Sequence, residues 1–164
     1  MSDFRVVNGD APKPTTDHAA TRLRQFALAL FCLGAAGTEV ELLLLGHTDS
    51  PPQFIPLVAL GLGIIAAVAV AVRPGPRVLR GFQVLMAGFV LTGPVGLYLH
   101  YHGNVEFELE MYPSLGGLDL VWKALTGATP ALAPGAMILL GLMGLASTYR
   151  HPALSRPTTA GESR

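Results

Sequence analysis

Residues 54–80 read FIPLVALGLGIIAAVAVAVRPGPRVLR, an uncharged apolar run followed at once by a short connection with three arginines. The apolar part, residues 54–72, would form a helix roughly 28 Å long at about 1.5 Å per residue. That length is close to the thickness of a bilayer hydrocarbon core, about 30 Å. The stretch therefore predicts a membrane-spanning helix that ends in a basic polar connection.

Three more apolar runs accompany this one, at about residues 25–45, 81–99 and 130–149. The chain has 164 residues, a normal length for one domain, and 51% of them are hydrophobic whereas 13% are charged. Its mean hydropathy is +0.47. We therefore expect an all-α integral membrane protein whose residues 21–150 form a transmembrane bundle of four helices.

The charged residues are sorted along the chain into alternating basic and acidic stretches. Ten of the eleven Lys and Arg residues lie before residue 25, between 73 and 80, or after 149. The other two connections hold acids, with Lys123 as their single base. Basic residues are retained on the cytoplasmic side during membrane insertion. The pattern predicts a multi-pass protein of a bacterial-type cytoplasmic membrane with both termini inside, and with disordered tails at 1–20 and 151–164.

Small residues recur at helical spacing in two of the predicted spans. Such strips let helix backbones approach closely in lipid, where van der Waals packing replaces the hydrophobic drive. The residues that we expect to pack in this way are Ala59, Gly63, Ala67 and Ala71 in the second span and Gly88 and Gly96 in the third. Pro94 cannot donate to the carbonyl of Val90, so the third span is expected to kink near Gly93.

The connection at residues 101–128 contains a helical pattern and a strand pattern. The helical one has apolar residues at i, i+3, i+4 and i+7, namely Leu118, Val121, Trp122 and Leu125. It predicts a short amphipathic helix that lies at the membrane interface with Trp122 at headgroup depth.

The strand pattern is the alternation of apolar and acidic residues at 105–111, which predicts an extended segment. Its outer acidic side chains, Glu106, Glu108 and Glu110, would then form one edge with a spacing of about 6.6 Å. We interpret this edge as a solvated face. A site that attracts calcium or a basic partner is the alternative, although the Gly-containing loop of a strong calcium motif is missing.

Glu39 and Glu41 lie within the first predicted span, near its outer end. A carboxylate at this depth costs several kcal/mol unless it finds a partner, faces the bundle interior or becomes protonated. Glu41 shares a helix face with Gly34, Gly37 and Thr38, which favours the bundle interior for it. The two carboxylates therefore indicate either contacts with headgroups and neighbouring helices or a role in binding or moving protons or cations.

His47, His100 and His102 follow the first and third spans, and all three are expected near the outer surface. Imidazoles at such positions are commonly satisfied by water or headgroups, but with carboxylates they can bind zinc, iron or copper. Two histidines on neighbouring helices can also ligate a haem. Three segments here have the look of motifs: GTEVELLLLGH at 37–47, LHYHGNVEFELE at 99–110 and TPALAPG at 129–135.

The sequence lacks several marks of enzymes. It has no HExxH, no paired CxxC, no phosphate-binding glycine loop and no nucleophile with a placed base. Cys32 stands alone, and the basic residues are too sparse for nucleic acid. We therefore expect a non-enzymatic accessory or assembly subunit of a larger membrane complex, of respiratory or photosynthetic type, in contact with lipid and with other subunits or copies of itself. The alternatives are a proton or cation carrier using Glu39 and Glu41, and a haem or metal protein using His47 and His100.

Overall fold

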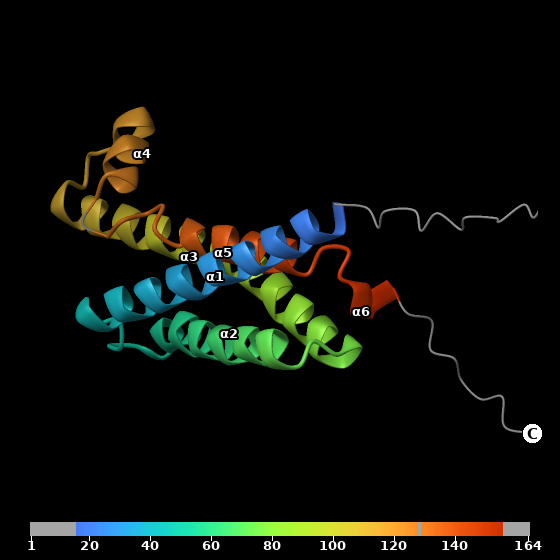
Figure 1. The fold of residues 1–164 in the computed structure, drawn as a ribbon. Coiled ribbons are helices and arrows are strands. Elements are labelled where there is room, and N and C mark those ends of the chain that lie inside the picture. The colour runs from blue at the N-terminus through green and yellow to red at the C-terminus, as the bar shows by residue number, and fades with distance from the viewer. Residues whose placement is uncertain (1–15, 128, 156–164) are drawn as a thin grey trace, which may run out of the picture.

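The structure is a computed structural model that describes residues 16–127 and 129–155, and throughout these residues its regular elements are helical. Figure 1 shows their arrangement. The elements are α1 (Thr16–Leu44), η1 (Pro51–Gln53), α2 (Phe54–Val72), α3 (Pro76–Met111), α4 (Gly117–Leu125), α5 (Gly135–Ser147) and α6 (Pro152–Ser155). α1 and α6 include parts of the two tails expected to be disordered, and the remainder of both tails lies outside the described residues.

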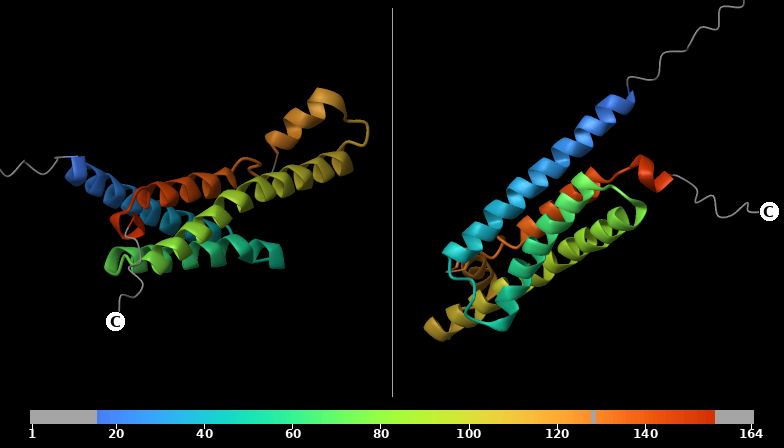
Figure 2. Two further views of the ribbon diagram at one scale, coloured as in Figure 1. Left: turned by 90° about the vertical axis from the view of Figure 1, so that its right-hand side faces the viewer. Right: turned by 60° about the horizontal axis from the view of Figure 1, so that its bottom comes forward.

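The four longest helices alternate in direction, so each connection returns the chain to the opposite end of the bundle (Figures 1 and 2). One end gathers the start of α1, the α2–α3 connection and α6, and we call it the arginine end after Arg24, Arg73 and Arg150. There the Arg24 guanidinium donates from Nη1 to the carbonyl of Arg150 at 3.4 Å. The other end holds His47, η1, the second half of α3 and α4, and we call it the histidine end.

Within residues 16–127 and 129–155, three helical segments are long and apolar enough to cross a membrane: His18–Leu44, Pro51–Val72 and Pro76–Met111. This finding is compatible with a multi-pass membrane protein. The fourth expected span is shorter than the range 130–149, because α5 covers the 13 residues Gly135–Ser147. Pro130 and Pro134 have no backbone N–H to donate, and the residues between them form turns before the helix begins.

α3 is longer than expected, and it overturns one prediction. Its 36 residues would extend about 54 Å, well beyond a hydrocarbon core of about 30 Å. Residues 105–111 are its last turns, so the prediction of an extended segment there is wrong. Pro94 lies inside α3, which stays helical on both sides of it. A segment whose apolar and acidic residues alternate can still be helical when one face of the helix packs against another element. Here α4 packs against α3.

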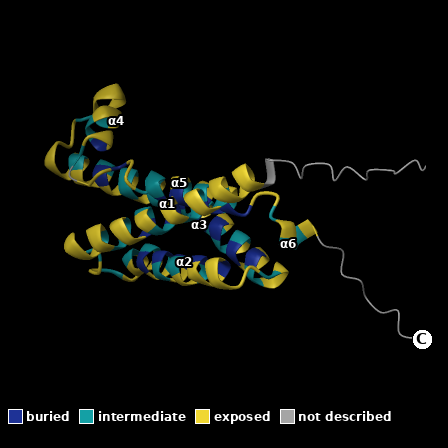
Figure 3. Ribbon diagram, in the orientation of Figure 1, coloured by how far each residue is buried: buried dark blue, intermediate teal, exposed yellow. Residues whose placement is uncertain are grey.

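The core lies between α1, α2, α3 and α5, and three phenylalanines occupy its centre. The Phe31 ring meets Phe82 edge to face at 5.7 Å between centroids and Phe89 at 6.0 Å. Large apolar side chains elsewhere on the helices face outward; Leu33, Ile65 and Val84 are each about 70% exposed. Figure 3 shows exposed residues along the outer sides of the bundle. A membrane-facing protein needs such a surface, since lipid tails cover it.

Glycines bring α3 and α5 into close contact, and we call Gly93, Gly96, Gly141 and Gly144 the glycine seam. A Cβ at Gly141 would stand 2.7 Å from the backbone oxygen of Met86, and one at Gly96 would stand 2.7 Å from Pro134 Cβ. Gly93 and Gly144 similarly face Ile138 and Met86. α3 and α5 share the most extensive helix contact in the described fold, which this absence of side chains permits.

The small residues expected to pack have different surroundings. Gly63 and Ala67 are buried, and a Cβ on Gly63 would stand 2.9 Å from the ring of Phe89. Ala59 packs partly buried against the core, whereas Ala71 is exposed. A Cβ at Gly88 would meet nothing within 4 Å. The four-residue repeat on α2 therefore faces the core in its first three members. On α3 the expected Gly96 packs closely together with Gly93, whereas Gly88 does not.

Candidate functional site at the histidine end

The three motif-like segments meet at the histidine end. His47 follows α1, His100 lies in α3, and Pro130 lies in the connection from α4 to α5. The rings of His47 and His100 are 6.3 Å apart between centroids, and His100 Nδ1 lies 3.2 Å from the carbonyl oxygen of Pro130. The fold thus brings together residues that are up to 83 positions apart in the chain.

The end of α1 fixes the position of His47. Gly46 has a left-handed backbone conformation, with φ of 65°, which glycine adopts without strain. The amides of Gly46 and His47 donate to the carbonyls of Leu43 and Leu42 at 3.2 and 2.9 Å. This pair of bonds is the Schellman motif, which ends many helices, and it fixes the backbone of His47 directly after Gly46.

The environment of His47 favours the neutral imidazole. Burial lowers the pKa of His47, the neighbouring His100 lowers it further, and Asp49 partly opposes both effects. The Pro130 carbonyl can only accept a hydrogen bond, so His100 carries its proton on Nδ1 in this contact. Its Nε2 then carries the free lone pair.

Asn104 is the best satisfied polar residue at this end, and sequence reasoning missed it. It is 3% exposed, and its Nδ2 donates to the carbonyls of Ala124 and Thr129 at 2.8 and 2.7 Å. Its Oδ1 accepts from the amide of Thr129 at 3.2 Å and from the Thr129 hydroxyl. Asn104 therefore joins α3 to the end of α4 and to the segment that leads to Pro130. The signal in the sequence was a lone amide side chain one turn after His100.

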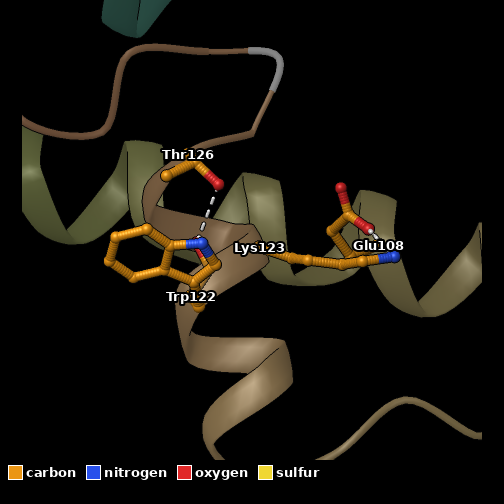
Figure 4. Close-up of polar contacts among 4 residues, drawn as sticks. All are labelled: Glu108, Trp122, Lys123 and Thr126. Atoms are coloured by element: carbon orange, nitrogen blue, oxygen red, sulfur yellow. Dashed lines mark hydrogen bonds and ion pairs between the residues drawn. The ribbon is translucent and has the colours of Figure 1, made fainter.

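A second set of contacts holds α4 against α3. Lys123 Nζ lies 3.8 Å from Glu108 Oε2 and 4.0 Å from the centroid of the Tyr112 ring. Figure 4 shows the lysine extending from α4 toward Glu108 on α3, beside Trp122 and Thr126. The Thr126 hydroxyl donates to the carbonyl of Trp122 at 2.9 Å, where the helix ends. We call Asn104, Glu108, Lys123 and their partners the polar clasp.

The expected amphipathic helix is present as α4, and its apolar face is exposed. Leu118 is 85% and Trp122 68% exposed, and Val121 and Leu125 are also open to the surroundings. The opposite side of the helix is closed, because Ala124 is fully buried against the clasp. The helix therefore presents its apolar residues to whatever adjoins the bundle at this end.

The remaining acids and His102 lie apart from this convergence. In a helix, residues two apart are turned by about 200°, so Glu108 points away from Glu106 and Glu110 and the three acids do not form one edge. Glu106 is exposed and lies 3.3 Å from His102 Nδ1, one turn earlier, while the His102 ring adjoins Tyr98 at 5.6 Å between centroids. Glu110 is exposed as well.

The two carboxylates of the first span differ from the expectation. Glu41, expected to face the bundle interior, is exposed. Glu39 is partly buried instead, and its Oε2 is buried without a hydrogen-bond partner within the described residues. Glu39 lies near the core face of α1, where the fully buried Phe31 and Ala35 also lie. Sequence spacing gave the separation of the two residues around the helix, but the packing of α1 decided which one turned inward.

No preformed cluster of three or more His, Cys, Asp or Glu residues able to hold a metal ion occurs among residues 16–127 and 129–155. His47 and His100 are therefore a pair of metal-competent groups and not a complete set of protein ligands. A scan of protein-family models, a search of curated proteins and a search of solved structures all returned no match to this chain.

Proposed function

We propose that this protein is a non-enzymatic, four-span subunit of a larger membrane complex, of respiratory or photosynthetic type, with both termini cytoplasmic. The positive-inside pattern supports the orientation, since it assigns the arginine end to the cytoplasm. The pairing of α5 along α3 supports the fourth span. α5 alone would cover about 20 Å, and the turns at 131–134 and 148–150 lengthen this segment at both ends.

One observation carries the subunit proposal: the hairpin of α3 and α4 is built firmly but leaves its apolar side uncovered. Asn104 makes four hydrogen bonds there, and Lys123 adds an ion pair. Fixing α4 in this way costs conformational entropy, yet the large side chains of its apolar face, such as Leu118 and Trp122, stay exposed. An exposed apolar face on a rigid support is typical of a surface that binds another protein.

Site-specific photo-crosslinking in intact membranes tests the proposal. A photoreactive amino acid at position 118 should form an adduct with one discrete protein, because Leu118 lies at the centre of the proposed contact. The same probe at Leu33, which is 72% exposed near the middle of α1, serves as the matched control and should yield lipid adducts. Lipid adducts at both positions, together with a monomer after mild solubilisation, would overturn the proposal.

A second function is favoured by Glu39, whose buried Oε2 has no hydrogen-bond partner among the described residues. A carboxyl group inside a membrane protein without a partner gains by taking up a proton, which suits a proton or cation carrier. Liposomes with the purified protein would test this reading by proton flux. Glu39→Gln should abolish flux, and Glu41→Gln should leave it, because Glu41 is exposed. Equal flux with wild type and Glu39→Gln would eliminate the carrier.

A further inference from the structure

We propose that His47 and His100 form a binding site for one transition-metal ion of the class that prefers imidazole, such as zinc or copper. The inference goes beyond the subunit function and does not depend on it. It starts from the pair of rings at the histidine end, 6.3 Å apart between centroids. The two residues come from the end of α1 and the middle of α3, so the fold and not the local sequence makes the pair.

The separation of the rings fits a shared ion. A zinc–nitrogen bond is about 2.0–2.1 Å long, and a ring nitrogen lies about 1.2 Å from the ring centroid, so each centroid would stand about 3.2 Å from the ion. Two imidazoles on one ion are then about 5.2 Å apart at a tetrahedral angle and about 6.4 Å apart when opposed. The observed 6.3 Å lies inside this range, and closing toward the tetrahedral value requires a movement of about 1 Å.

The surroundings of His100 match those of a metal ligand. Histidines that bind metals almost always donate their second ring N–H to a carboxylate, a carbonyl or water, which fixes the tautomer. His100 makes this contact through Nδ1 with the carbonyl of Pro130 at 3.2 Å. That carbonyl is held in turn, because three hydrogen bonds tie the preceding Thr129 to the buried Asn104. The polar clasp thus orients the lone pair of His100.

The remaining ligands would be water, because no third His, Cys, Asp or Glu among the described residues completes a metal-binding group with this pair. Asp49, two residues after His47, acts on that ring through its charge. Imidazole and water are ligand types that zinc and copper accept. The opposed arrangement is also that of two axial imidazoles on a haem iron, so the absorption spectrum of the purified protein separates a haem from a single ion. The grooves beside Leu23 and beside Cys32 lie on the arginine half of the bundle.

Zinc titration of the metal-free, full-length protein in lipid nanodiscs provides the test, followed by calorimetry. Wild type should bind one ion per chain. His47→Ala and His100→Ala should each weaken binding at least 100-fold, and Asp49→Asn should weaken it about 10-fold. His102→Ala is the matched control, because His102 lies on α3 two residues after His100 but pairs with Glu106. It should bind like wild type.

A spectroscopic readout separates ligation from a folding defect. With Co²⁺ in place of zinc, wild type and His102→Ala should show a visible absorption band that His47→Ala and His100→Ala lack. All four proteins should keep the same helical circular dichroism spectrum. Three results would overturn the proposal. The first is equal zinc affinity in wild type and the His47→Ala/His100→Ala double variant, and the second is a loss of zinc affinity in His102→Ala as large as in His47→Ala or His100→Ala. The third is a haem spectrum in the purified wild type.

Discussion

α3 is held to its neighbours in two different ways along its length. Its first half meets α5 across the glycine seam, where Gly93 and Gly96 face side chains of α5 and the preceding turn, and a single side-chain hydrogen bond from Gln83 Nε2 to Thr148 Oγ1 at 3.1 Å lies at the end of this contact. Its last turns meet α4 through the polar clasp of Asn104 and Glu108. One continuous helix thus packs mainly by shape in one part and mainly by polar contacts in the other.

The proposed membrane position of each part accounts for the difference. In hydrocarbon, burial of apolar groups gives little advantage over lipid, so close backbone approach supplies the stability. Beyond the span, water competes for each polar group, and a buried amide is stable there only when its partners are complete. The stability of the seam should therefore fall when a substitution adds volume. The stability of the clasp should fall when a substitution removes a hydrogen-bonding group.

The largest effect is expected from Gly141→Ala in the seam. Its new Cβ would stand 2.7 Å from the Met86 carbonyl oxygen, a backbone atom that cannot rotate away. Overpacking of this kind costs about 1–3 kcal/mol. Gly88→Ala is the control, because its Cβ would meet nothing within 4 Å, and it should be neutral or slightly stabilising. Unfolding of both variants in detergent measures the difference, and equal stability would show that α3 and α5 are not in close contact.

A smaller and more local effect is expected from Asn104→Ala in the clasp. The substitution leaves the carbonyls of Ala124 and Thr129 without their donor, which costs about 1–3 kcal/mol when those groups stay buried. α4 can instead open and let water satisfy them, so we expect hydrogen exchange to rise in residues 117–129 while the seam stays protected. Gly103→Ala, at an open neighbouring position, should exchange like wild type. Unchanged protection of α4 in Asn104→Ala would contradict the clasp.

The smallest effect is a pH dependence at His47. Its pKa is lowered by burial and by His100, so the folded state binds this proton less readily than the unfolded chain does. The contribution to stability is present above the unfolded pKa of about 6.5 and is lost as pH falls toward the folded pKa. The metal-free protein should therefore melt at a lower temperature at pH 5.5 than at pH 7.5, and His47→Gln should reduce that difference. His102→Gln should retain it, and a steeper dependence in His47→Gln would contradict the assignment.

The sequence predicted the helical class, the apolar segments and the short amphipathic helix, because each depends on local periodicity. It failed at residues 105–111, where alternation suggested a strand but the residues continue α3. It also failed for Glu41, since a helix face is defined only relative to its neighbours. The sequence named His47 and His100 together as possible metal or haem ligands, but no spacing could show that their rings come together while His102 turns toward Glu106.

By itself, the sequence determined that this protein is a chain of apolar helices with sorted charge, since hydropathy and charge are properties of each residue and its near neighbours. Only the tertiary structure decided that α5 lies on α3 through glycines, that Asn104 is buried among carbonyls, and that Glu39 rather than Glu41 faces inward. These features depend on contacts between segments far apart in the chain. The physical reason is that burial and hydrogen bonding of a side chain are set by the partner that packs against it, and local sequence does not contain that partner.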